Sequence, residues 1–213
     1  MTAVRTLLAC GALAGPVFVI VGFGQAFTRQ GFDITRHPLS VLSNGDLGWI
    51  QVANFLVSGL LVVAGAVGMR QVLRPGRAAT WGPLLVGGYG LGLVAAAIFR
   101  ADPMDGFPPG TPPGPPAAIS TFGLLHFVVA AIAFFSLIAA CFVFARRFGA
   151  LGERGWAAYS AATGLIFFAA FASGGGQPAF NVAFAVAVVL AWAWLSAMAL
   201  RLMGEAASGQ TLA

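Results

Sequence analysis

Two histidines and their polar neighbours are the residues of this chain whose chemistry could support catalysis or metal binding. His37 stands three residues before Ser40, and His126 follows Asp102 further along the chain. A serine, a histidine and an aspartate could act as a nucleophile, its base and the group that orients the base. Alternatively, both histidines and Asp102 could be three ligands of a metal ion that keeps one position open for water. The sequence lacks the spacing of established hydrolase, zinc-protease and nucleotide-binding motifs, so neither hypothesis is specific.

The chain that carries these residues is too apolar for a water-soluble domain. Hydrophobic residues make up 59% of its 213 positions and charged residues only 8%, whereas a soluble domain has about 25% charged residues. The net charge of +5 comes from eleven arginines, and there is no lysine. This composition excludes a soluble globular enzyme, a disordered chain and a nucleic-acid-binding domain, and it predicts an integral membrane protein.

Six stretches without Asp, Glu, Arg or Lys are long enough, or nearly so, to cross a bilayer, which takes about 20 helical residues. They are residues 7–27, 50–69, 81–99, 122–145, 157–173 and 178–200. Since these stretches are apolar on every side, they are expected to be helices rather than strands of a barrel. The prediction is therefore an all-α integral membrane protein, a single bundle of six transmembrane helices over residues 1–213.

The arginines predict how the bundle is oriented, because cytoplasmic loops collect basic residues. Three arginines fall in the loops of residues 28–48 and 100–121, which are therefore expected to be extracytoplasmic. The other eight fall on the opposite side, so both termini are expected to be cytoplasmic. Those eight are Arg5, Arg70, Arg74, Arg77, Arg146, Arg147, Arg154 and Arg201.

Polar side chains within the six stretches all fall near their extracytoplasmic ends. They are Gln25, Gln51, Asn54, His126, Gln177 and Asn181. Because an unpaired polar group in an apolar medium costs several kcal/mol, this grouping predicts a polar pocket open to the extracytoplasmic side. The pocket would bind a lipid headgroup or a small amphiphile, with contacts from the two loops supplied by Arg36, His37, Ser40, Arg100 and Asp102. The alternative is that these residues merely meet the headgroups of surrounding membrane lipids.

The two extracytoplasmic loops also have patterns of their own. Residues 36–44 predict a short helix at the membrane surface, with Leu39 and Leu42 toward the lipid and Ser40 and Ser43 toward the bundle. Asp46 is expected to cap the helix that follows. The other loop holds seven of the twelve prolines and is expected to be an extended lid, under which His37, Asp102 and His126 converge. Ser120 and Thr121 are then expected to cap the next helix.

Several short motifs are similar to those of a known family. Gly31-Phe32-Asp33 with Arg36-His37-Pro38-Leu39-Ser40, Gly48-Trp49-Ile50-Gln51 with Asn54-Phe55, and Phe99-Arg100-Ala101-Asp102-Pro103 with Gly106-Phe107-Pro108-Pro109-Gly110 and Gly123-Leu124-Leu125-His126 carry the similarity. The chain thereby resembles the bacterial membrane family catalogued as domain of unknown function 998. The resemblance implies a six-helix bundle in the bacterial plasma membrane and names no reaction.

Two functional hypotheses follow. The first is a protein that binds a lipid headgroup or small amphiphile in the extracytoplasmic pocket. The second is a membrane-embedded hydrolase or transferase that uses His37, Ser40, Asp102 and His126, with or without a metal. The sequence assigns no cofactor and no protein partner.

Overall fold

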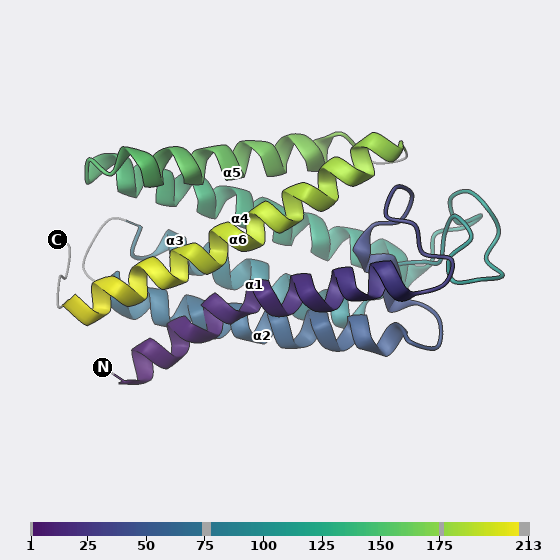
Figure 1. The fold of residues 1–213 in the computed structure, drawn as a ribbon, viewed down its shortest axis with the longest axis horizontal. Coiled ribbons are helices and arrows are strands. Elements are labelled where there is room, and N and C mark those ends of the chain that lie inside the picture. The colour runs from purple at the N-terminus through teal and green to yellow at the C-terminus, as the bar shows by residue number, and fades with distance from the viewer. Residues whose placement is uncertain (1, 74–77, 175–176, 209–213) are drawn as a thin grey trace.

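The computed structural model describes residues 2–73, 78–174 and 177–208, and in these residues the chain forms six long helices (Figure 1). Each of the six is long and apolar enough to cross a membrane, which confirms the predicted six-helix membrane bundle. The predicted stretches form the centres of longer helices. The elements are α1 (Thr2–Thr28), η1 (Leu39–Ser43, a 3-10 helix), α2 (Gly48–Val72), α3 (Trp81–Ile98), α4 (Thr121–Ala150), α5 (Arg154–Ala172) and α6 (Pro178–Ser208).

The six helices form a closed ring. Each helix packs against its neighbours in the chain, and α6 packs back against α1. The first helix begins, and the last one ends, at the same end of the bundle, which we call the terminal end (Figure 1). The opposite end carries the segments of residues 29–47 and 99–120 and is called the loop end. Helix α6 crosses the bundle diagonally, close to α5 at the loop end and close to α1 toward the terminal end.

Close contacts between glycines hold neighbouring helices together in the middle of the bundle and toward its terminal end. A Cβ atom added to Gly65 of α2 would lie 2.6 Å from the Cα of Gly11 in α1, and one added to Gly59 would lie 2.7 Å from the carbonyl oxygen of Gly90 in α3. Small residues of this kind let helix backbones approach closely in a membrane. The three helices are therefore packed too tightly at these points to leave space between them.

Charged residues at the terminal end also connect helices. Arg147 of α4 and Glu205 of α6 form an ion pair of 3.3 Å, and each side chain is only 3% exposed. Arg201 of α6 pairs with Glu153, which directly precedes α5, at 2.9 Å. These contacts connect α4, the start of α5 and α6, and removing one partner of the buried Arg147–Glu205 pair would leave an uncompensated buried charge. Arg74 and Arg77, which contributed to the topology prediction, lie outside the described residues.

The loop end differs from the sequence prediction in three respects. The segment of residues 36–44 is not a surface helix, since only Leu39–Ser43 is helical and its leucines are buried in the bundle core. Asp46 does not cap α2, because Leu47 occupies the cap position and no side chain bonds there. The proline-rich loop is not extended: the backbone N–H of Asp105 donates to the carbonyl of Gly114 at 2.9 Å and folds the loop back on itself. Burying Leu39 and Leu42 removes apolar surface from water, which favours the buried position of the first segment. Pairing backbone N–H and C=O groups within the proline-rich loop favours its folded form over an extended one.

The predicted cap of α4 is confirmed for Ser120, whereas Thr121 is the first residue of the helix itself. The side chain of Ser120 accepts a hydrogen bond from the backbone N–H of Gly123 at 2.9 Å. Asp102 holds this serine in place, since its carboxylate accepts from the Ser120 hydroxyl at 2.6 Å and from the Ser120 N–H at 2.9 Å. Asp102 therefore ties the end of α3 to the start of α4.

Candidate ligand-binding site

A cavity of about 480 Å³ lies inside the ring toward the loop end, and we call it the chamber. Every helix of the ring contributes to its lining. Its described lining residues include no Asp, Glu, Arg or Lys, and most are apolar. The chamber is bordered by the aromatic residues Phe18, Phe55, Tyr89, Phe127, Phe134, Phe171, Phe184 and Trp192, by small residues such as Gly92, Ala96, Ala130 and Ala185, and by the polar residues His37, Ser40, His126 and Asn181.

A second cavity of about 550 Å³ lies among the segments of the loop end, and we call it the vestibule. Its charged lining residues are Arg36, Asp102 and Asp105, and its other walls come from residues 35–41, 101–105 and 115–119 and from the start of α6. The residues that border both cavities are Pro38, Ser40, Phe127, Gly174 and Asn181. The uncharged chamber and the vestibule, whose lining includes charged side chains, therefore meet at these residues.

Aromatic rings form the deep wall of the chamber. Trp192 of α6 stacks on Phe18 of α1 with centroids 4.7 Å apart, and Tyr89 of α3 lies 5.4 Å from the same indole. All three side chains are buried. Sequence reasoning missed this wall, because helices that are apolar on every side give no periodic signal of the face that points inward.

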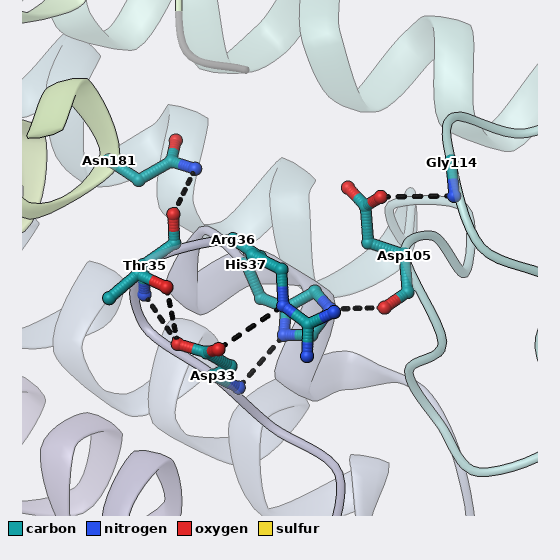
Figure 2. A network of polar contacts seen from close by, with 7 residues as sticks. All are labelled: Asp33, Thr35, Arg36, His37, Asp105, Gly114 and Asn181. Carbon is teal, nitrogen blue, oxygen red and sulfur yellow. Dashed lines mark hydrogen bonds and ion pairs between the residues drawn. The ribbon is translucent and has the colours of Figure 1, made fainter. Parts of the chain in front are cut away.

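The first loop closes over the chamber through a network of polar contacts (Figure 2). Asn181 reaches from α6 and donates to the carbonyl oxygen of Thr35 at 2.9 Å. Asp33 accepts from the hydroxyl and the backbone N–H of Thr35. These bonds lower the pKa of Asp33, and the nearby Arg36 adds to the effect. The network holds residues 33–37 between α6 and the proline-rich loop.

His37 is fully engaged within this network. Its Nδ1 accepts from the backbone N–H of Asp33 at 2.9 Å, so its Nε2 carries the proton and donates to the carbonyl oxygen of Asp105 at 3.1 Å. The side chain is only 1% exposed. With both ring nitrogens bonded to backbone, His37 joins the two loops and has no nitrogen left to act as a base for Ser40.

Arg29 strengthens the same junction, and the sequence did not indicate its role. Its guanidinium donates to the carbonyl oxygens of Leu42 at 2.5 Å and Asn44 at 2.7 Å. It also lies 4.9 Å from the ring centre of Phe107 in the proline-rich loop. Burial lowers the pKa of Arg29, and the charge of Asp46 opposes this shift. The bonding partners are backbone carbonyls, which no sequence pattern identifies.

His126 has a different environment from His37. It lies in the second turn of α4, is 4% exposed and borders the chamber. Its Nδ1 lies 2.8 Å from the carbonyl oxygen of Phe99. Since a carbonyl can only accept, Nδ1 carries the proton and Nε2 is left as an acceptor. No described residue bonds Nε2, and it is not among the polar atoms sealed inside the protein.

His37, Asp102 and His126 share no hydrogen-bond partner, although the charge of Asp102 acts on His126. Each of the three is bonded to a different part of the backbone or to Ser120. Among the residues that the structure describes, no three His, Cys, Asp or Glu side chains are placed to hold a metal ion. The geometry therefore offers neither a serine–histidine–aspartate arrangement nor a three-ligand metal centre built from these residues.

The other predicted ligand contacts lie apart from both cavities. Gln25 of α1 donates to Gln51 of α2 at 2.9 Å, and Asn54 donates to the carbonyl oxygen of Phe18 at 3.1 Å. These three amides connect α1 to α2 and border neither cavity. Arg100 and Gln177 are exposed and also border neither. Of the predicted contacts, the chamber is bordered by His37, Ser40, His126 and Asn181, and the vestibule by Arg36, Ser40, Asp102 and Asn181.

Residues 12–201 match the family described as protein of unknown function (DUF998). The chain belongs to this family. No curated protein and no solved structure matches it. The matched range includes every residue named above as lining the chamber or the vestibule. It also includes at least the central part of each of the six helices. Together with the six apolar helices, the family match describes a multi-pass membrane protein.

Proposed function

We propose that this DUF998 protein binds an amphiphile, a lipid headgroup with its chain or a small amphiphilic molecule, in the chamber and the vestibule. The apolar part of the ligand would lie in the chamber, and its polar end near Ser40, His126 and Asn181. The observation that carries the proposal is that a cavity without charged lining residues meets one that is lined by three charged side chains, at the residues that border both. Arg36 and Asp102 would form the outer rim, and His37 would hold the loop that covers the site.

The size and lining of the chamber support this proposal. Small-molecule sites measure about 300–1,000 Å³ and are mostly apolar with a few polar groups. The chamber volume of 480 Å³ lies within this range. An apolar chain would fill the space favourably, at about 0.8 kcal/mol per buried CH₂ group.

We place the protein in the bacterial plasma membrane, with both termini cytoplasmic. The excess of arginine toward the terminal end supports this orientation. In that orientation the vestibule faces the extracytoplasmic side. The ligand would then come from the outer leaflet or from the extracytoplasmic space.

Trp192 provides a direct test, because its indole borders the chamber and is only 1% exposed. Bromine on a lipid chain quenches a tryptophan that it touches. A dibrominated C18 monoacylglycerol, added to the detergent-solubilised full chain, should quench a component of the fluorescence that saturates with probe concentration. The variant Trp192→Phe should lose this component and keep the quenching of the exposed Trp49 and Trp81.

A second variant tests the location of the site. Ala130 of α4 borders the chamber, and Ala130→Phe should fill it and weaken the saturable quenching at least tenfold. The matched control is Ala139→Phe on the same helix, since Ala139 borders neither cavity. Equal quenching in the wild type and in Trp192→Phe, or equal effects of the two alanine substitutions, would contradict the proposal.

A further inference from the structure

We infer that the polar end of this ligand is an uncharged hydroxyl group that donates a hydrogen bond to Nε2 of His126. The inference rests on the proposed function and narrows it to one chemical class, an uncharged hydroxyl-bearing lipid. It excludes both a phosphate headgroup and a fatty acid anion as the preferred ligand.

The protonation state of His126 is set by its surroundings. The Nδ1–H donates to the carbonyl oxygen of Phe99 at 2.8 Å, at the end of α3. In the neutral ring Nε2 is then an acceptor, and no described residue bonds it. The ring borders the chamber and is 96% buried, given its 4% exposure. A ligand that fills the chamber must therefore present a donor to this atom or leave it unpaired, which is unfavourable.

Asn181 offers the same kind of contact at the boundary between the two cavities. Its Nδ2 donates to the carbonyl oxygen of Thr35 at 2.9 Å (Figure 2). Its Oδ1 is thereby left as an acceptor, and no described residue donates to it. The hydroxyl of Ser40 lies on the same boundary. These positions favour a ligand end that carries one or more hydroxyl donors.

The charges around the site disfavour an ion, and an anion above all. The chamber has no charged residue in its described lining, so a buried anion there would lack a counter-charge. A buried cation would have only the charge of Asp102, which lines the vestibule and acts on His126. The vestibule is lined by one arginine and two aspartates, which sum to one net negative charge. Arg36 already pairs with Asp33 at 3.2 Å, while the carboxylates of Asp102 and Asp105 accept from Ser120 and Gly114. No surplus cation is therefore available among these lining residues for a phosphate or carboxylate.

The test compares four dibrominated C18 probes of equal chain length by the quenching of Trp192 at pH 8. They are an alcohol, its methyl ether, a carboxylate and an amine. We expect the alcohol to bind about fivefold more tightly than the ether, which corresponds to one net neutral hydrogen bond. We also expect the alcohol to bind more tightly than either charged probe. A wild-type protein that prefers the carboxylate or the amine, or that does not distinguish alcohol from ether, would overturn the inference.

His126→Asn is the matched variant for this test. The asparagine side chain keeps an N–H donor at the δ position for the carbonyl of Phe99 and lacks the ε nitrogen. It should bind the ether as the wild type does and lose the preference for the alcohol, so a preference retained in this variant would overturn the inference. If no probe quenches Trp192 in a saturable manner, the proposed function itself fails. The comparison of probes on the wild-type protein remains decisive if the variant does not fold.

Discussion

Replacing Gly123 with alanine should destabilise the protein because the carboxylate of Asp102 occupies the place of the added methyl group. A Cβ atom at Gly123 would lie 2.1 Å from Oδ2 of Asp102 and 2.5 Å from its Cγ. Such contacts do not occur between real atoms, so the aspartate must leave its position. It would then lose its hydrogen bonds to the hydroxyl and the N–H of Ser120.

The expected loss follows from these contacts. Two hydrogen bonds of partly exposed groups contribute about 1 kcal/mol each. Weakening the Ser120 cap of α4 adds up to about 1 kcal/mol. The sum is about 2–3 kcal/mol, which corresponds to a fall of roughly 4–12 °C in apparent Tm for a chain of this size.

The buried thiol of Cys141 provides the assay. It is 1% exposed in the folded protein, so it reacts with a fluorogenic thiol reagent only when the bundle unfolds. The partly buried Cys10 should be replaced by serine in the background protein. Gly149→Ala in the same helix is the control, because an added Cβ there meets nothing within 4 Å, and its melting temperature should not fall.

A double substitution separates the clash from other effects of the methyl group. Gly123→Ala combined with Asp102→Ala removes the clash, so it should be no less stable than Asp102→Ala alone. The reasoning would be refuted if Gly123→Ala had the same melting temperature as Gly149→Ala. It would also be refuted if the destabilisation by Gly123→Ala and that by Asp102→Ala were additive in the double variant.

Two further predictions concern acid stability and topology. Since hydrogen bonds from Thr35 lower the pKa of Asp33, this carboxylate stabilises the fold above its ordinary pKa of about 3.9, and the contribution is lost as the pH falls through the lowered value. Thermal melts between pH 6 and 3 should therefore fall less steeply for Asp33→Asn than for the wild type, and parallel curves would contradict this account. In a cysteine-free protein, Pro113→Cys at the loop end should react with an impermeant thiol reagent in intact cells, and Gly149→Cys at the terminal end should not. The reverse pattern would invert the proposed orientation.

The number and the rough positions of the membrane helices could be predicted because they follow from local composition. A stretch without charge that spans the bilayer has no stable alternative to a helix. The start of α4 was also predictable, since Ser120 accepts from an N–H only three residues away. Such features require no knowledge of the rest of the fold.

The fate of the polar residues could not be predicted in the same way, because their partners are distant in sequence. Gln51, Asn54 and Ser58 follow one another at helical spacing and lie on one face of α2. That spacing predicts a polar face but does not say whether it meets a cavity or another helix. In the structure it meets Gln25 and a carbonyl of α1, while Gln25 Oε1 and Gln51 Nε2 are buried without a partner among the described residues.

The same limit explains the two histidines, which the sequence treats alike and the structure separates. His37 bonds backbone groups four and sixty-eight residues away, and the second of these depends on how the proline-rich loop folds back. Its place is understood once Asp105 is seen to pair with Gly114. The histidine that remains available for a ligand is identified only after such internal bonds have been assigned.

The internal bonds of the loop end therefore bear on function as well as on stability. In an apolar bundle each buried polar atom is expected to have a partner, and His37, Asp102 and Arg29 have theirs within the protein. His126 is bonded through one nitrogen, and its ring borders a cavity whose described lining is free of charge. A packing role would be served equally well by phenylalanine, whereas a histidine fixed by Phe99 offers an acceptor of defined direction. This arrangement favours recognition of a neutral donor over metal binding, since no three His, Cys, Asp or Glu side chains among the described residues are placed to hold a metal ion.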